Sequence, residues 1–338
     1  MRLLVITQAV DTEDQALGFF HRWLEELAQK FETLEVICLK EGKHSLPANV
    51  HVHSLGKEGA QKTTIYRSLL RFAYLGRLLR YIVVLKYDAV FVHMNEEYVL
   101  LGGWWWRFCG KRVVLWRNHK MGSWRTRLAV RLSNTVCYTS PEAFTARYKK
   151  ALQMPVGIDT GFFVPPPVPS PADTVLFLGR IDPVKKVEVF IEALGKIILP
   201  RKVSIYGSPT GPDSAYAKRL AEKIEIHPGV PHQETRALYQ SHAIYVNLTP
   251  SGSFDKTIGE AMASGCIVVC ANEALRGILP EQLLAGGTAD SAAKALEYAL
   301  GMSQSARQAL VMDQREYVVR EHSLHLLAGR LQAVLQNK

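Results

Sequence analysis

The residues best suited to chemistry follow the apolar run Thr174–Leu178. Gly179 and Arg180 come directly after this run, and Lys185 stands five residues after Arg180, where a helix is expected to begin. Glycine lets a ligand approach the backbone, the arginine fork fits phosphate oxygens, and lysine supplies a mobile positive charge. The start of a helix adds partial positive charge. On this spacing alone, a phosphate site and an ordinary turn with surface charges are equally good interpretations.

A second candidate is the small, polar loop at 249–257, which leads into a short helix ending at Gly265. Backbone N–H groups at such a helix start suit a phosphate or the hydroxyls of a sugar. Glu260 lies in this helix, and a carboxylate accepts hydrogen bonds from two neighbouring hydroxyls such as those of ribose. Without further information, a surface glutamate on an amphipathic helix is the better interpretation.

Short apolar runs rich in β-branched residues alternate with helical patterns in both halves of the chain. This alternation predicts parallel sheets with helices on both faces, and ligands at the carboxyl ends of the strands. The expected strands are Leu3–Thr7, Leu34–Leu39, Ala89–Val92, Val113–Trp116, Thr135–Tyr138, Thr174–Leu178, Val203–Tyr206, Ala243–Asn247 and Ile267–Cys270.

A proline-rich segment at 164–172 separates the two halves and predicts a stiff linker. The chain is therefore expected to have a first Rossmann-like domain at 1–163 and a second at 173–315. A helix at 316–338 completes the chain, and its packing back on the first domain is one option.

The two candidate motifs, in this order, resemble those of the family-4 retaining glycosyltransferases. That family has a strand ending in G-R, a lysine near the next helix, and then E-x7-E, whose second glutamate begins E-A-M-A. Here the matching residues are Gly179-Arg180, Lys185 and Glu260-Ala261-Met262-Ala263. The resemblance implies the α/β fold class GT-B, with two doubly wound Rossmann-like domains facing a central cleft. It also implies transfer of a hexose from a UDP- or GDP-linked sugar to a glycan or lipid-linked acceptor, as in polysaccharide biosynthesis.

Carried over to this chain, the resemblance assigns His119, Arg180 and Lys185 to catalysis. His119 follows a strand and would lie beside the transferred sugar, Arg180 and Lys185 would neutralise the donor diphosphate, and Glu260 would bind the ribose. His21 and Arg22 either face the acceptor or form the polar side of a helix. The donor-binding set implied by the resemblance is Gly18, Gly179, Arg180, Lys185, Val230, Ser253, Phe254, Asp255, Lys256, Thr257 and Glu260.

The chain departs from the family pattern at two positions. The first glutamate of E-x7-E is replaced by Gly252, so Asp255 or a serine hydroxyl takes over its work, or the sugar preference differs, or activity is weak. Lys186 stands where the family usually has glycine, a difference expected to be minor. No convincing D-x-D motif is present, and neither an essential metal nor a cofactor is expected.

The charge of the chain is concentrated in its first half. Residues 1–160 hold 23 Lys+Arg against 14 Asp+Glu, while the net charge of the whole chain is +10. Such a half attracts a negative partner, and no motif supports nucleic acid. A basic amphipathic helix at 64–82 and the run Trp104-Trp105-Trp106, of which at least one is expected to be exposed, favour an anionic membrane surface. An ordinary surface helix with its apolar side in the core explains 64–82 almost as well.

Two other functions remain open from the sequence. A catalytically weak nucleotide-sugar-binding protein is compatible with Gly252, and a GT-B sugar-nucleotide epimerase would share the architecture but not E-A-M-A. Five scattered cysteines, no apparent signal peptide and no long apolar stretch predict a cytoplasmic protein, with attachment to the inner membrane face as an option.

Overall fold

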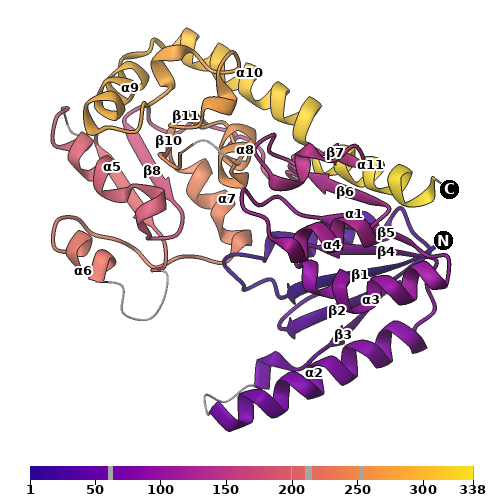
Figure 1. The fold of residues 1–338 in the computed structure, drawn as a ribbon. Helices are drawn as coiled ribbons and strands as arrows, with labels where there is room; N and C mark the ends of the chain where they lie inside the picture. Colours follow the sequence, from indigo (N-terminus) through magenta and orange to yellow (C-terminus); the bar gives the residue numbers. More distant parts are fainter. Residues whose placement is uncertain (60–63, 199, 210–214, 251–253, 338) are drawn as a thin grey trace. The chain divides into compact units, whose positions relative to one another are not determined.

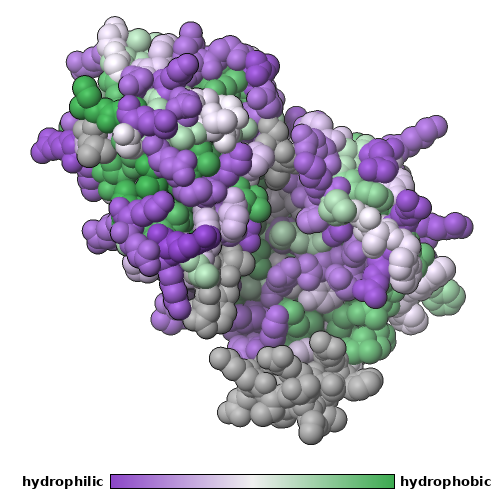
Figure 2. Space-filling model, turned by 60° about the vertical axis from the view of Figure 1, so that its left-hand side comes forward, coloured by the Kyte–Doolittle hydropathy of each residue, from purple (hydrophilic) through white to green (hydrophobic). Residues whose placement is uncertain are grey.

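A computed structural model describes residues 1–59, 64–198, 200–209, 215–250 and 254–337. The chain divides into two compact units (Figure 1). Unit 1 comprises Met1–Gly157 together with Leu324–Lys338, and unit 2 comprises Ile158–Ser323. Hydrophilic side chains cover most of the face shown in Figure 2, and hydrophobic side chains form smaller groups among them.

Within the described residues, unit 1 has a seven-stranded sheet of order β3-β2-β1-β4-β5-β6-β7, and every pairing is parallel. In the central strand β1, Leu3 and Val5 belong to one hydrophobic core, while Leu4 and Ile6 belong to another. Both faces of the sheet are therefore covered, as strand alternation requires. The strands are β1 (Arg2–Val10), β2 (Thr33–Glu41), β3 (Val50–Ser54), β4 (Ala89–His93), β5 (Arg112–Trp116), β6 (Thr135–Tyr138) and β7 (Ala151–Gln153).

Two sets of helices cover the two faces of this sheet. Helices α1 (Phe19–Ala28) and α11 (Leu324–Gln336) share the core that contains Leu3. Helices α2 (Thr64–Val84), α3 (Glu96–Phe108) and α4 (Trp124–Leu132) cover the other face. Helix α11 thus comes from the far end of the sequence to pack beside α1.

Unit 2 has a four-stranded parallel sheet of order β11-β10-β8-β9 in the part of the chain that is described. Its strands are β8 (Thr174–Leu178), β9 (Lys202–Tyr206), β10 (Ile244–Asn247) and β11 (Ile267–Cys270). Helices α5 (Val187–Leu194), α6 (Ala215–Ala221) and α9 (Ala289–Gly301) contribute to the core on one face. Helices α7 (His232–Gln240) and α8 (Lys256–Ala263) lie against the other, and α10 (Gln304–His322) packs on α8 (Figure 1).

The structure differs from the predicted domain boundaries. The chain leaves unit 1 after Gly157, and the proline-rich segment 164–172 lies wholly within unit 2. Gln240 of α7 holds this segment, because its side-chain amide donates to the Val164 carbonyl at 2.7 Å and its carbonyl accepts from Ser170 at 2.6 Å. The expected helix at 316–338 is interrupted at Ser323, where the chain returns to unit 1. Strands β3 and β7 were not predicted.

Gly157 stands at the point where the chain leaves unit 1, and its conformation requires glycine. Its φ is +76°, and a Cβ would lie 2.4 Å from Leu327 and 2.8 Å from the Trp23 ring. The Gly157 carbonyl accepts a hydrogen bond from the Trp23 indole at 3.1 Å. This glycine therefore lets α1 and α11 pack closely against the end of the unit.

Candidate functional site

The first motif forms a tight turn between β8 and α5. A Cβ on Gly207, which follows β9, would lie 1.9 Å from the Gly179 carbonyl oxygen, so these two backbones meet only because residue 207 is glycine. The Asp182 carboxylate accepts from the backbone N–H groups of Val184 and Lys185 at 3.0 and 3.2 Å. The other carboxylate oxygen of Asp182 lies 3.5 Å from the Arg180 guanidinium, whose side chain remains 64% exposed. The turn therefore fixes the backbone and leaves Arg180 accessible.

Lys185 and Asp255 form the centre of a polar cluster, called here the Lys185 cluster. The Lys185 ammonium donates to Asp255 at 2.5 Å and to Thr249 at 3.1 Å. The same Asp255 oxygen accepts from Asn247 at 3.2 Å and from Thr249 at 3.1 Å. Asn247 also donates to Thr257 at 3.2 Å. The cluster lies where β8 and β10 end, which is the edge of a parallel sheet at which ligands bind.

The Lys185 cluster controls the protonation of its carboxylate. Burial by itself raises the pKa of Asp255, but the Lys185 ammonium and the Asn247 and Thr249 donors outweigh it and hold that pKa below the ordinary 3.8. Asp255 is therefore a carboxylate at neutral pH. Lys256, the next residue, has its pKa lowered by burial to about 7, with Glu260 opposing the shift. The start of α8 thus holds one firmly charged pair and one lysine that titrates near neutrality.

Glu260 is held by two partners in a site that is almost closed. Its side chain is 5% exposed, one oxygen lies 2.9 Å from the His232 ring, and the other accepts from the Tyr239 hydroxyl at 3.2 Å. Burial and the nearby Glu260 charge raise the pKa of Tyr239 well above its usual range. Val230, half-buried, lies two residues before His232. The structure therefore brings Val230, a member of the predicted donor-binding set, within two residues of a direct partner of Glu260.

The remaining residues of the second motif are only partly described. Phe254 is half-buried and its ring lies 4.7 Å from the His322 ring. Ser253 lies outside the described residues, as do Gly252 and Ser251, so their predicted roles stay predictions.

In unit 1, His119 lies three residues after β5 with an exposed side chain. Its Nδ1 is 3.0 Å from both the backbone nitrogen and the backbone oxygen of Met121. When the Met121 N–H donates to Nδ1, Nε2 carries the ring proton and is the nitrogen left for a ligand. Asn118 fixes the loop beside it, because its side-chain oxygen accepts from the N–H groups of Thr139 and Ser140 at 3.1 and 2.9 Å.

The residues expected near the acceptor lie at the start of α1. Gly18 precedes α1 with φ −54°, a conformation that does not itself require glycine. His21 is buried, its Nε2 accepts from the Ser45 N–H at 3.1 Å, and burial lowers the pKa of its ring. Arg22 is half-buried in the same helix turn. His21 therefore ties α1 to the chain after β2, while acceptor binding by His21 and Arg22 stays a prediction.

Polar residues at the carboxyl ends of β1 and β4 were missed from the sequence. Nδ1 of the buried His93 lies 3.2 Å from the Thr7 hydroxyl, and its ring stacks on Phe20 at 4.1 Å. Gln8 donates to the Asn95 side chain at 2.6 Å. These residues could have been identified from the sequence, because they end or follow apolar runs at the edge of a parallel sheet where ligands bind.

The β4–α3 turn adds a buried charge and an unusual backbone. Glu96 is buried and pairs with Arg117 at 3.0 Å. Met94 has φ +69°, a left-handed conformation that is uncommon outside glycine. This turn lies at the same sheet edge as His93 and His119, and it has the charge and the backbone constraint that are typical of binding loops.

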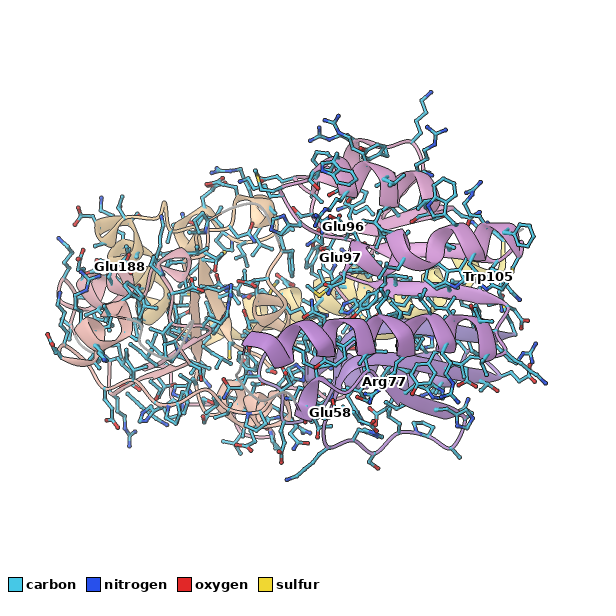
Figure 3. The ribbon with its side chains drawn as sticks, turned by 60° about the horizontal axis from the view of Figure 1, so that its bottom comes forward. Glu58, Arg77, Glu96, Glu97, Trp105 and Glu188 are labelled. Atoms are coloured by element: carbon cyan, nitrogen blue, oxygen red, sulfur yellow. The ribbon has the colours of Figure 1, made fainter. Side chains whose placement is uncertain are left out.

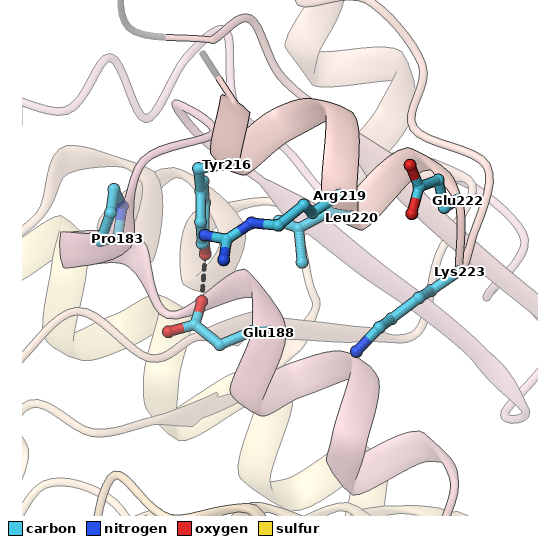
Figure 4. A pocket seen from close by; sticks show the side chains of 7 residues that line it. All are labelled: Pro183, Glu188, Tyr216, Arg219, Leu220, Glu222 and Lys223. Atoms are coloured by element: carbon cyan, nitrogen blue, oxygen red, sulfur yellow. Dashed lines mark hydrogen bonds between the residues drawn. The ribbon is translucent and has the colours of Figure 1, made fainter.

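A separate cavity of about 440 Å³ lies between α5 and α6 (Figure 4). The Tyr216 hydroxyl donates to Glu188 across it. Pro183 is the only one of its lining residues that belongs to the turn after β8. The walls carry both signs of charge, from Glu188, Glu222, Arg219 and Lys223, so the cavity has no preference for an anion. Within the described ranges, no group of three or more His, Cys, Asp or Glu is arranged to hold a metal ion.

Comparison with known proteins finds a family similarity over part of unit 2. Residues 172–301 match the model of the family described as Glycosyl transferases group 1. Over 148 residues the chain is 25% identical to D-inositol 3-phosphate glycosyltransferase of Kineococcus radiotolerans, a stretch that spans 36% of this chain and 34% of that protein. The match therefore extends over about a third of this relative's length.

Solved structures resemble the chain over its whole length. HepE of Anabaena, in complex with UDP and glucose, superposes with a TM-score of 0.75 at 15% identity and covers 100% of both chains. Sucrose-phosphate synthase of Thermosynechococcus elongatus gives a TM-score of 0.74 at 18% identity, covering 99% of this chain and 98% of its own. The fold is therefore GT-B. Over residues 172–301, the chain is similar to the glycosyl transferases group 1.

Proposed function

We propose that the chain is a retaining glycosyltransferase that moves a sugar from a nucleotide-diphosphate sugar to a glycan or lipid-linked acceptor. The observation that carries this proposal is the Lys185 cluster, which joins the two separate motifs of the family segment at one sheet edge. Lys185 follows β8, Asp255 precedes α8, and the two are 2.5 Å apart. Residues far apart in sequence thus form one polar site at the ligand-binding edge of the sheet, and the exposed Arg180 follows the same strand β8.

Cleavage of a sugar–phosphate bond places negative charge on the leaving diphosphate. The exposed Arg180 would stabilise that charge as a preorganised cation, while Lys185 is held in a fixed position by Asp255. Asp255 already accepts three hydrogen bonds and pairs with Lys185, so we assign it a positioning role rather than that of a nucleophile. Retention then follows if the acceptor attacks from the side of the leaving phosphate, which takes up the acceptor's proton. His119 would orient the sugar.

Nucleoside recognition is proposed for the turn at 228–231 and Glu260. A carboxylate offers about four lone-pair sites, and His232 and Tyr239 occupy one on each oxygen. Glu260 therefore retains capacity for the two ribose hydroxyls while its partners fix its orientation. Because HepE was solved with UDP and glucose, UDP-glucose is the first donor to test.

The test begins with binding. Calorimetry and thermal unfolding would compare UDP, GDP, ADP and their glucose conjugates on the wild type, Arg180→Ala and Lys185→Ala. Lys196→Ala is a matched control, because Lys196 pairs with Asp290 in an exposed ion pair of the same unit. Ligand at about a hundred times its dissociation constant adds roughly 2.7 kcal/mol of stability. We expect one nucleotide to stabilise the wild type and Lys196→Ala, and to bind at least about tenfold more weakly to the other two.

A double variant distinguishes two reasons why Lys185→Ala would weaken nucleotide binding: loss of the Lys185 ammonium and the unpaired charge that it leaves on Asp255. Lys185→Ala leaves the Asp255 charge unpaired, so the double variant Lys185→Ala/Asp255→Asn should recover part of the lost affinity. Turnover would then be followed by nucleotide release with oligosaccharide and lipid-linked acceptors, and the product's anomeric configuration by NMR. Failure of all three nucleotides to bind at millimolar concentration would contradict the donor site, and an inverted product would contradict retention.

The glycine at position 252 supports a second candidate function. Where the family has a carboxylate, this chain has none at that position, which favours a nucleotide-sugar-binding protein of weak activity. That function predicts nucleotide binding without measurable transfer to any acceptor. An epimerase would instead convert the nucleotide sugar without an acceptor, which the same NMR assay detects.

A further inference from the structure

The outer face of α3 is apolar although it is exposed. Leu101, Trp104, Trp105 and Phe108 recur at helical spacing, which places them on one side of the helix. Trp104 is 65%, Trp105 42% and Phe108 85% exposed, whereas Trp106 is completely buried. The expectation that at least one of the three consecutive tryptophans is exposed is therefore confirmed. Two exposed indoles and an exposed phenyl ring within five residues are unusual on a surface that contacts only water.

Helix α2 extends this apolar surface. It packs beside α3, and Leu79, Val83 and Val84 in its carboxyl half are exposed. Both helices connect parallel strands, so both run opposite to the sheet and end at the same edge. Figure 3 shows the two helices side by side, with Trp105 near the carboxyl end of α3 and Glu96 and Glu97 at its amino end. The exposed apolar side chains of the two helices are called here the Trp104 face. They are Leu79, Val83 and Val84 of α2 and Leu101, Trp104, Trp105 and Phe108 of α3.

The Trp104 face lies in the most basic part of the chain. Residues 64–132 hold 13 Lys+Arg against three Asp+Glu, so they carry a net charge equal to the +10 of the whole chain. In the carboxyl halves of α2, α3 and α4 and the turn after α2, the exposed basic side chains are Arg77, Arg80, Lys86, Arg107 and Arg131. Two of the three acids, Glu96 and Asp88, are paired with Arg117 and Arg2.

We propose that the Trp104 face docks on an anionic lipid bilayer. Indole rings favour the headgroup region, where one edge is apolar and the rest is wet, and phenyl and aliphatic side chains enter the acyl boundary. Surrounding lysine and arginine side chains are attracted to anionic headgroups, each contributing about fivefold to partitioning. Among the described residues, no helix combines the length and the apolar character needed to cross a membrane. The bilayer is therefore contacted by a surface rather than by a span.

The charge also favours a bilayer over a second copy of this chain. Two copies joined through the Trp104 face would bring two strongly positive surfaces together, which opposes association. An anionic bilayer offers the opposite sign over an area wide enough for both helices. In this proposal the aromatic part of the contact comes from α3, and the expected amphipathic helix at 64–82 adds the exposed Leu79.

Co-sedimentation of the full chain with vesicles tests the proposal, and it does not depend on transferase activity. Vesicles of phosphatidylcholine would be compared with vesicles containing about 30 mol% phosphatidylglycerol. We expect binding to the anionic vesicles at least about tenfold tighter than to the neutral ones, weakening as salt rises from about 0.1 to about 0.5 M. A blue shift of tryptophan emission on binding would place the exposed indoles in the lipid.

Two variants and a matched control make the test specific. Trp104→Ser/Trp105→Ser/Phe108→Ser removes the aromatic contact and should reduce binding at least about tenfold. Arg80→Gln/Lys86→Gln should reduce binding to anionic vesicles about 25-fold and leave binding to neutral ones unchanged. Met312→Ser/Val319→Ser removes two exposed apolar side chains from α10 of unit 2 and should bind like the wild type.

Three outcomes would overturn the proposal. The first is the absence of any preference for anionic vesicles, and the second is equal binding by the aromatic variant and the α10 control. The third is a dimer of the wild type in sedimentation velocity that is lost only in the aromatic variant. The last would identify a second copy of the chain as the occupant of the Trp104 face. Circular dichroism of each variant shows that it is folded before binding is compared.

Discussion

Replacing Asp255 by asparagine tests whether the Lys185 cluster holds unit 2 together. The change keeps the shape of the side chain and removes its charge, so the Lys185 ammonium loses its partner at 2.5 Å. The lysine side chain is 14% exposed and the aspartate 27%. Breaking a fully buried pair costs about 3–5 kcal/mol, while exposed pairs contribute about 0–1 kcal/mol. Because this pair is partly exposed, we expect Asp255→Asn to lower the free energy of unfolding by about 2 kcal/mol.

The assay can follow the two units separately. All six tryptophans, Trp23, Trp104–Trp106, Trp116 and Trp124, belong to unit 1, so their fluorescence reports on that unit alone. Far-UV circular dichroism reports on both units. With a urea slope of about 2 kcal/mol per M, a loss of about 2 kcal/mol lowers the midpoint of unit 2 by about 1 M. Asp290→Asn is the matched control, because it neutralises the exposed pair with Lys196 and should cost less than about 1 kcal/mol.

The pH dependence gives a second check of the same reasoning. The folded pKa of Asp255 lies below its ordinary 3.8, so the pair stabilises the protein above about pH 4 and this contribution disappears as the pH falls through the folded value. The difference between wild type and Asp255→Asn should therefore shrink in acid. Equal midpoint shifts for Asp255→Asn and Asp290→Asn at neutral pH would refute the argument.

Three further changes test the backbone and charges around the cluster. Lys186→Gly should raise the stability of unit 2 by about 0.5–1 kcal/mol in urea unfolding, because Lys186 has φ +53°; a loss would show that its side-chain contacts matter more. Gly207→Ala should cost at least about 2 kcal/mol, since its Cβ would overlap the Gly179 carbonyl, whereas Gly301→Ala, which adds a Cβ in open space, should be nearly neutral. Because burial lowers the pKa of Lys256 to about 7, unit 2 should gain stability as the pH rises from about 7 to about 10, and Lys256→Met should flatten that rise.

The strands of both units could be predicted from the sequence because they are buried on both faces. Thr135–Tyr138, Thr174–Leu178 and Ile267–Cys270 begin and end as predicted, since each is a short apolar run between polar turns. Strand β3 (Val50–Ser54) was missed because the alternation of valine with histidine at an edge gives no continuous apolar run. The predicted linker failed for a different reason: proline stiffens the backbone wherever it lies, and only the contacts with Gln240 show that the segment stays within unit 2.

The candidate site could be predicted as a set of residues but not as a set of contacts. Family motifs pointed to Lys185, Asp255 and Glu260, yet the approach of Lys185 to Asp255 joins positions 70 residues apart and has no sequence signature. The same holds for the contacts of Glu260 with His232 and Tyr239. Lys186 was considered a minor departure, but its left-handed backbone shows that a glycine there is favoured by conformation.

Asp255 changes how Lys185 can serve a diphosphate. The family's first carboxylate would stand at position 252. In this chain the Asp255 carboxylate contacts the Lys185 ammonium directly, so the Lys185–Asp255 pair presents little net charge to an approaching anion. In the proposed donor site, attraction of the donor would then depend on the exposed Arg180 and on Lys256, whose pKa is lowered to about 7 by burial. A bound diphosphate favours the protonated lysine, so donor binding should take up protons and weaken as the pH rises above about 7. On this proposal, Lys185 contributes a fixed position, and Arg180 and Lys256 contribute the charge.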